Sequence, residues 1–249
     1  MICGSALAMA DLAGNGSGGG LPGDPYIFGY SDSNSVVLLT ATNNYGHTYV
    51  FRTDYGEINF GTPNQGWWST SETNSDDNGN YVVGTGIKKA GDTFNDYFTF
   101  RMNEFESVRG TIVSASLVIP TGFGNCTPQP SCEITEPYPV TYQVGSVSVG
   151  ASALNNKSDN PDSSMVTALA SGKVYGDYTF DNLGDYSGSV TIALDSAALA
   201  DLNAVIGSRD YFSIGGTVVP ATAPEPGSLV LLGSIVAGVF WSIQRKPRQ

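Results

Sequence analysis

Residues 111–119 read TIVSASLVI, and this stretch has the clearest strand pattern in the chain. Successive side chains of a β-strand point to opposite faces, so the stretch separates an apolar series from a more polar one. The apolar face would hold Val113, Ala115, Leu117 and Ile119, and the other face would hold Ile112, Ser114 and Ser116. This alternation predicts an antiparallel strand with one buried face and one face toward solvent.

Similar patterns predict further strands on both sides of this one. Residues 35–41 and 48–52 flank the turn residues NNYG (43–46), which predicts a hairpin. Residues 140–149 change their apolar phase at Gly145, which is typical of a β-bulge. Other short strands are expected at residues 57–60, 81–84, 96–101, 173–180, 189–194 and 211–219, and residues 62–80 are expected to form a long polar loop.

Two short helices are expected among these strands. One would be N-capped by Asn160 and bury Val166 and Leu169, and the other would be N-capped by Asp195 and end at Gly207. Many short strands with few helices are typical of a mainly β fold. We therefore expect an antiparallel two-sheet β-sandwich, jelly-roll-like, over residues 26–219.

The composition excludes some functions. Residues 1–223 carry 22 acidic and 8 basic side chains, a net charge of −14, and such a surface repels nucleic acid. Only 14% of the residues of the chain are charged, which suits a loop-rich extracellular β protein. Residues 1–10 end in Ala8-Met9-Ala10 and are interpreted as a truncated signal-peptide remnant, and residues 11–25 as a flexible linker.

The last thirty residues, 220–249, differ from the rest. Pro224, Glu225 and Pro226 are followed by residues 227–243, which have no ionisable side chain, and then by the basic residues Arg245, Lys246 and Arg248. As a helix, residues 227–243 would be about 25 Å long, near the shortest length that crosses a bilayer. The basic cluster would place the C-terminus in the cytoplasm. A buried C-terminal helix is the alternative.

In this order, the motif, the apolar helix and the basic cluster resemble the PEP-CTERM sorting signal of bacteria that make exopolysaccharide. The resemblance implies that a membrane-embedded exosortase recognises Pro224, Glu225 and Pro226 and cuts the chain near them. It also implies export, a temporary inner-membrane tether, and then a place at the cell surface or in the medium. The alternating segments of residues 60–220 resemble an ectodomain common in PEP-CTERM proteins, which is similar to carbohydrate-binding modules.

Three aromatic residues are candidates for binding a glycan. Trp67 and Trp68 would point in opposite directions in an extended segment, so one of them could stack on a sugar ring while the other packs inward. Tyr81 could extend this platform. The alternative is that all three belong to the core or its rim. The expected partner is extracellular polysaccharide or the biofilm matrix.

Two cysteines and several carboxylates are further candidates. Cys126 and Cys132 flank a proline-containing loop and could form a disulfide; two free thiols or half of a metal site are the alternatives. Oxygen-rich clusters at Asp76 and Asp77 and at Asp159 and Asp162 could bind calcium. Neither cluster matches an EF-hand, so solvated turns or a helix cap are the alternatives, and no other cofactor is expected.

Catalysis is not expected. His47 is the only histidine and lies in a predicted turn, with no nucleophile in a recognisable motif. Pairs of carboxylates for glycoside hydrolysis remain an alternative, because sequence alone cannot place two of them across a cleft. A structural or adhesive matrix protein that binds other proteins is the second alternative.

Overall fold

The structure is a computed structural model that describes residues 26–30, 36–73, 79–85, 92–102, 108–121, 139–157, 161–180, 188–206, 208 and 210–219. Its strands are β1 (Tyr26–Tyr30), β2 (Leu38–Asn43), β3 (Thr48–Arg52), β4 (Gln65–Ser69), β5 (Tyr81–Thr85), β6 (Thr93–Arg101), β7 (Ile112–Thr121), β8 (Val140–Ser146), β9 (Val174–Phe180), β10 (Gly188–Ala193) and β11 (Tyr211–Val219). Most of the described chain is therefore strand, as expected.

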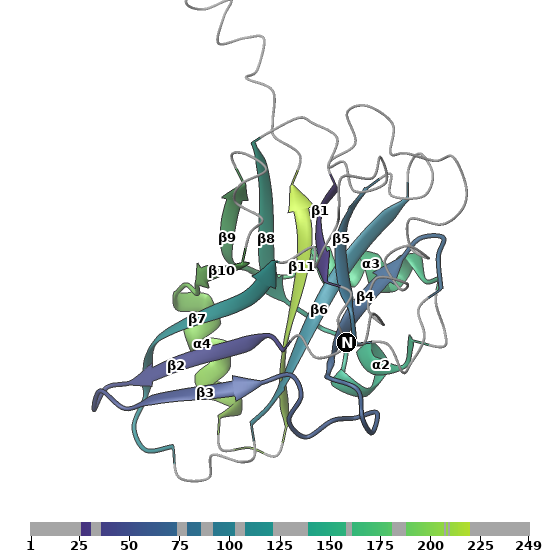
Figure 1. Cartoon of the computed structure of the whole chain (residues 1–249). Helices are drawn as coiled ribbons and strands as arrows, with labels where there is room; N and C mark the ends of the chain where they lie inside the picture. The colour runs from purple at the N-terminus through teal and green to yellow at the C-terminus, as the bar shows by residue number, and fades with distance from the viewer. Residues whose placement is uncertain are drawn as a thin grey trace, which may run out of the picture. The chain divides into compact units, whose positions relative to one another are not determined.

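The strands form two antiparallel sheets (Figure 1). The larger sheet has the order β1-β5-β6-β11-β8-β9, with β4 also paired to β6, and the smaller sheet has the order β10-β7-β2-β3. This arrangement is consistent with the predicted sandwich. The sheets have seven and four strands among the described residues, and the jelly-roll-like strand order that the sequence suggested stays a prediction.

One apolar core joins the two sheets. The smaller sheet contributes Leu39, Leu117 and Ile192, and the larger sheet contributes Phe98 and Ile214, all buried in the same cluster. In β6 every residue from Phe94 to Phe100 is buried, because the second face of this strand is covered as well. The cover of the larger sheet comes from helices.

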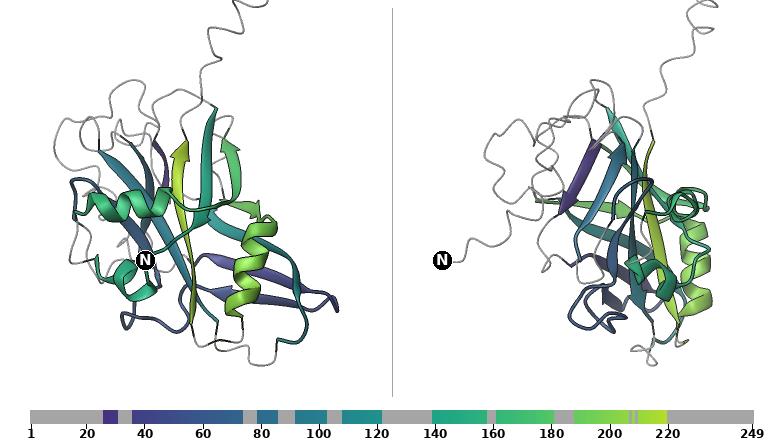
Figure 2. Two further views of the ribbon diagram at one scale, coloured as in Figure 1. Left: turned by 180° about the vertical axis from the view of Figure 1, so that it is seen from behind. Right: turned by 90° about the vertical axis from the view of Figure 1, so that its right-hand side faces the viewer.

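The structure describes three helices, α2 (Ala151–Asn155), α3 (Ser163–Ala170) and α4 (Ser196–Val205), all on the same side of the larger sheet (Figure 2). The sequence predicted α3 and α4 but not α2. Val166 and Leu169 of α3 are buried, as expected. The N-cap of α3 is Asp162 rather than Asn160, because the Asp162 carboxylate accepts hydrogen bonds from the second and third backbone N–H groups of the helix. Asp195 caps α4, as predicted.

Three register shifts occur among the strand pairs: one between β1 and β5 at Tyr26 and Phe28, one between β8 and β9, and one between β2 and β7. Val144 pairs with Gly176 and Gly145 pairs with Val174, so a bulge lies at Gly145 as expected, but its extra residue is Tyr175 of the partner strand β9 and not a residue of the 140–149 strand. At the start of β7, Thr42 pairs with Ser114 and Asn43 with Ile112, so Val113 is the extra residue. Ile112 is consequently buried, and Val113 is 53% exposed. The prediction that Val113 belongs to the buried face is therefore wrong.

Residues 57–80 also differ from prediction. The expected strand at residues 57–60 is a series of bends, held in part by the Ile58 N–H, which donates to Asn64 Oδ1 at 2.8 Å. The expected loop at residues 62–80 contains β4, whose five residues are all buried. β4 pairs with β6 from Gln65 to Ser69, so the pairing supplies the partners that its polar backbone requires.

Candidate interaction surface

The three aromatic rings predicted to stack on a glycan are buried. Trp67, Trp68 and Tyr81 are 2%, 1% and 1% exposed. Trp67 Nε1–H donates to Asn80 Oδ1 at 3.1 Å, and its ring centre lies 5.2 Å from that of Phe94. The two tryptophans do belong to different apolar clusters, as alternation predicted. The prediction that one of them meets a sugar in solvent is wrong, and the alternative that they pack in the core is confirmed.

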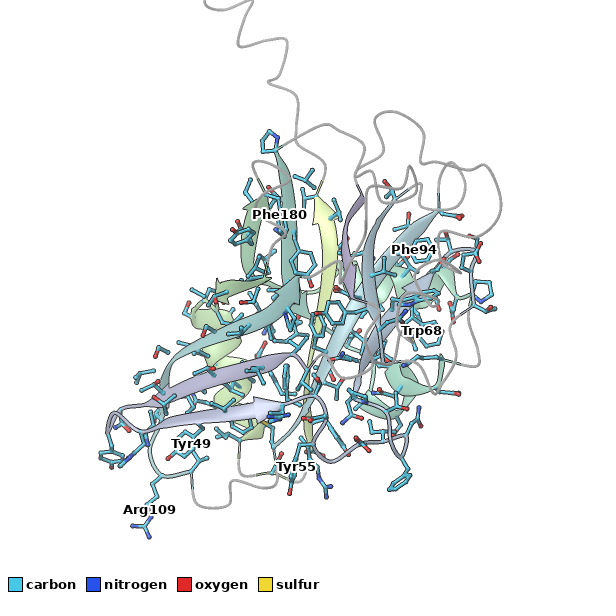
Figure 3. All side chains as sticks on the ribbon, viewed as in Figure 1. Tyr49, Tyr55, Trp68, Phe94, Arg109 and Phe180 are labelled. Atoms are coloured by element: carbon cyan, nitrogen blue, oxygen red, sulfur yellow. The ribbon has the colours of Figure 1, made fainter. Side chains whose placement is uncertain are left out.

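The contacts of Trp68 explain why its ring cannot reach a ligand in solvent. Its Nε1–H donates to the backbone carbonyl of Leu154 in α2 at 3.0 Å. Its ring belongs to a cluster with Tyr97, Val166 and Leu169, so α2 and α3 cover the outer side of β4 and β6 (Figure 3). The hydrogen bond satisfies the one polar atom of the indole, and the ring is therefore a structural element of the helix–sheet contact.

Most of the other predicted site residues lie outside the described residues. These are Asp76, Asp77, Asp159, Cys126, Cys132, Pro224, Glu225, Pro226, Arg245, Lys246 and Arg248. Asp162 is described and caps a helix, and His47 is exposed in the β2–β3 turn. Within the described ranges no group of three or more His, Cys, Asp or Glu residues could hold a metal ion. No helix in the same ranges is long and apolar enough to cross a membrane.

The smaller sheet has one face that the core does not use, which we call the outer face. It consists of the residues that alternate with the buried ones: Thr48, Val50 and Arg52 of β3, Leu38, Thr40 and Thr42 of β2, Ser114, Ser116 and Val118 of β7, and Ser189, Thr191 and Ala193 of β10. None of these residues is buried, and none is acidic, although the chain carries 23 acidic residues. Most of the outer face bears hydroxyl groups, with aliphatic side chains between them.

The pairing register arranges these side chains in rows across the four strands. In one row Thr40 lies between Val50 and Ser116, and Ser116 pairs on its other side with Ala193. Because neighbouring strands are about 4.8 Å apart, such a row extends roughly 15 Å. The side chains in it are small, so the surface has no large projections. The hydroxyl groups of Thr42 and Thr48 lie 3.0 Å apart, within hydrogen-bonding distance.

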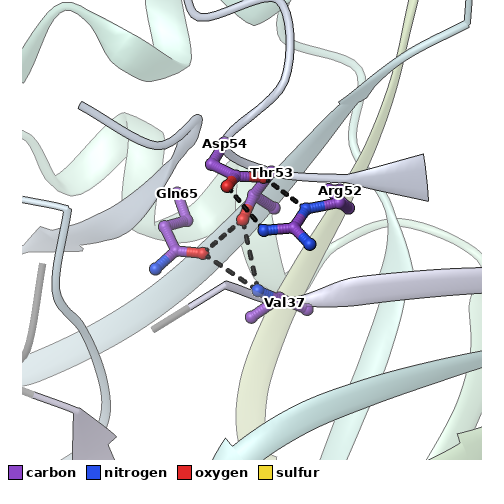
Figure 4. Close-up of polar contacts among 5 residues, drawn as sticks. All are labelled: Val37, Arg52, Thr53, Asp54 and Gln65. Atoms are coloured by element: carbon purple, nitrogen blue, oxygen red, sulfur yellow. Dashed lines mark hydrogen bonds and ion pairs between the residues drawn. The ribbon is translucent and has the colours of Figure 1, made fainter. Parts of the chain in front are cut away.

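Arg52 is the one charged residue of the outer face, and a carboxylate neutralises it. Arg52 Nε–H and Nη2–H donate to the two carboxylate oxygens of Asp54 at 2.8 and 2.7 Å (Figure 4). Hydrogen bonding from Arg52 lowers the pKa of Asp54 below its ordinary value, and the same bond raises the pKa of Arg52. At neutral pH the pair is therefore ionised and carries no net charge.

A buried hydrogen-bond junction next to this pair holds the end of β3. Thr53 Oγ1–H donates to Gln65 Oε1 at 2.6 Å, and the Val37 N–H donates to Thr53 Oγ1 at 3.2 Å (Figure 4). Gln65 Nε2–H donates in turn to the Gly79 carbonyl at 2.7 Å. Gln65 belongs to the larger sheet and Thr53 follows β3 of the smaller sheet, so the junction connects the two sheets.

A second polar feature, which the sequence analysis missed, lies inside the core. Asp96 is fully buried, and Tyr142 Oη–H donates to its Oδ1 at 2.8 Å. Its Oδ2 has no hydrogen-bond partner among the described residues. Burial raises the pKa of Asp96 to about 8, so this carboxyl group is predominantly protonated at neutral pH.

Gly216 makes room for this bond. It lies on β11 between β6 and β8, pairing with Asp96 on one side and with Val144 on the other. A Cβ atom at Gly216 would overlap both Tyr142 Oη and Asp96 Oδ1. Paired glycines inside a strand are a signal of close approach, and Gly215-Gly216 is the sequence feature that could have indicated the buried pair.

Comparison of the chain with models of protein families, with curated proteins and with solved structures gives no match.

Proposed function

We propose that this protein is exported, is sorted by an exosortase, and associates without catalysis with extracellular polysaccharide at the cell surface. The sorting part is supported by the order of Pro224-Glu225-Pro226, the uncharged residues 227–243 and the terminal basic cluster. Within this signal, residues 227–243 would be the membrane helix.

Sorting is tested by the mass of the C-terminal peptide of the mature protein, recovered from its native cell surface and medium. We expect the chain to end near residues 224–227, or to carry an added group there. Replacing all three motif residues by alanine should leave the chain intact and in the membrane fraction. Wild-type protein that is intact through Gln249 and remains with the membrane would refute exosortase processing.

The polysaccharide part rests on the outer face. In a chain of net charge −12, the outer face presents no carboxylate and one cation, which is already paired. Hydroxyl groups both donate and accept hydrogen bonds, and the aliphatic side chains between them can contact the apolar faces of sugar rings. These properties suit a neutral polysaccharide that lies flat on the sheet. An anionic polymer would gain nothing from this surface and would be repelled by the rest of the chain.

Binding is tested with the full chain on two polymers, amorphous cellulose as a neutral polysaccharide and alginate as an anionic one. We expect retention on cellulose that salt does not abolish, and no retention on alginate. Thr191→Glu places a carboxylate on the outer face and should weaken retention about tenfold or more, the equivalent of about 1.4 kcal/mol. Thr179→Glu on β9 is the matched control, because Thr179 is also an exposed strand threonine. Equal retention of the two variants would refute the outer face as the binding surface.

A further inference from the structure

The outer face ends at a strand edge where, among the described residues, the only backbone hydrogen bond to an edge-directed group runs from the Tyr55 N–H to the Arg52 carbonyl at 3.4 Å. β3 is last in the order β10-β7-β2-β3 and pairs with β2 on one side. The Asn43 N–H donates to the His47 carbonyl at 2.9 Å, which sets the hydrogen-bonding pattern of the hairpin. Since this pattern alternates, Thr48, Val50 and Arg52 direct their backbone N–H and C=O groups away from β2 and toward the free edge.

The other edge strands with described side chains are protected. β9 has the bulge at Tyr175 and the exposed carboxylate of Asp177. β10 lies beside β9, and the chain after it is bonded to that strand through the Asp195 N–H and the Tyr175 carbonyl at 2.8 Å. β4 is buried along its whole length. Prolines, bulges and unpaired charges are usual devices that prevent two edges from pairing. β3 has no proline and no bulge, and its one charged residue, Arg52, is paired with Asp54.

We propose that β3 is a docking edge for β3 of a second copy of this chain, with the two strands antiparallel and centred on Val50. In this register Val50 faces Val50 of the second copy, and Thr48 faces the second copy's Arg52. Each of these facing pairs exchanges two backbone hydrogen bonds, so the smaller sheets of the two copies become one continuous sheet.

The sequence of the strand, TYVFR, fits a two-fold axis through its centre. An aliphatic residue lies at the axis and a polar one at each end, so the strand is complementary to itself. Arg52 does not face Arg52 of the second copy, so the two guanidinium groups do not meet, and each keeps its Asp54 partner. Tyr49 and Phe51 point to the opposite side, where Phe51 is buried in the core, so pairing of the edges exposes no apolar side chain. The junction of Thr53 and Gln65 holds the end of the strand before a partner arrives.

A single cysteine at the proposed axis tests the register. In a hydrogen-bonded antiparallel pair the two Cα atoms are about 5.5 Å apart, within the range that a disulfide spans. Under mild oxidation, full-length Val50→Cys should form a covalent dimer joined through residue 50 of both copies, identified by the mass of the linked peptide. Val113→Cys is the matched control, because Val50 and Val113 are 45% and 53% exposed and Val113 lies on β7. Equal yields of the two dimers would overturn the proposal.

Two further variants separate docking from folding. Val50→Pro removes an N–H that β2 does not use and should abolish dimers, while the far-ultraviolet circular dichroism of the fold is retained. Val50→Thr keeps the N–H and the β-branched shape and should dimerise as the unaltered chain does. Sedimentation of the full-length variants in detergent over a concentration series measures how far each of them dimerises. A contact of one short strand per copy is small, so we expect a weak, concentration-dependent dimer. Dimerisation of Val50→Pro equal to that of the unaltered chain would also overturn the proposal.

Discussion

The buried carboxyl group of Asp96 should make the stability of the protein depend on pH. Its pKa is 3.8 in an unfolded chain and about 8 in the folded one, so the folded state holds a proton that the unfolded state releases. A pKa raised by folding contributes stability that is complete below pH 4 and is lost as the pH rises from about 4 to 8. Each unit of the difference is worth about 1.4 kcal/mol of unfolding free energy.

The perturbation that isolates this effect is Asp96→Asn. Asparagine keeps an acceptor for Tyr142 Oη and replaces the acid O–H by an N–H that does not ionise. Between pH 5 and pH 9 the two pKa values predict a loss of about 4 kcal/mol from Asp96 in the unaltered chain, and this part of the loss should be absent in the variant. Asp54, Asp162 and Asp201 do not interfere, because their pKa values are lowered and their contributions are lost below about pH 4.

The assay is urea unfolding of both chains at pH 5, 7 and 9, with the free energies compared at each pH. Asp177→Asn, which removes an exposed carboxylate of β9, is the control and should follow the unaltered chain. We expect Asp96→Asn to gain several kcal/mol over the unaltered chain as the pH rises. If the two curves stay parallel to within about 1 kcal/mol, Asp96 is not held as a neutral acid in the folded state.

Three further changes test the packing by equilibrium unfolding in urea at neutral pH. Gly216→Ala places a methyl group on the bond between Asp96 and Tyr142 and should cost several kcal/mol, whereas Gly150→Ala, where a Cβ meets open space, should cost well under 1 kcal/mol. Trp68→Ala leaves a cavity beneath α2 and α3 and should lower the unfolding free energy by about 3–5 kcal/mol. Almost no loss would show that the ring lies at the surface. Asp195→Ala removes the cap of α4 and should cost about 1 kcal/mol, and an unchanged unfolding midpoint would show that the cap is not formed in solution.

Local chemistry was sufficient to predict much of the fold. The hairpin of β2 and β3 follows from a turn sequence between two alternating segments, and the cap of α4 follows from one aspartate before an apolar stripe. The change of apolar phase at Gly145 marked the position of a bulge, but the extra residue belongs to the partner strand β9, which the sequence did not indicate. Each of these signals is contained within a few neighbouring residues.

The candidate site could not be predicted in the same way. Trp67 and Trp68 look like exposed aromatics because polar residues surround them in the chain, yet α2 and α3 cover one ring and β5 and β6 cover the other. The outer face carries no motif at all. Its character comes from residues of four strands that the pairing register places side by side, and no short window of sequence contains them.

The sequence by itself determined the period of each strand, the acidic balance of the chain and the order of the C-terminal motif, since these are properties of residues and their neighbours. Only the tertiary structure decided which of two alternating faces is covered. It turned Val113 outward because β7 gains a residue against β2. It neutralised Asp96 because the surrounding core excludes the water that would solvate a charge. Both outcomes depend on what packs against a residue, and packing partners come from distant parts of the chain.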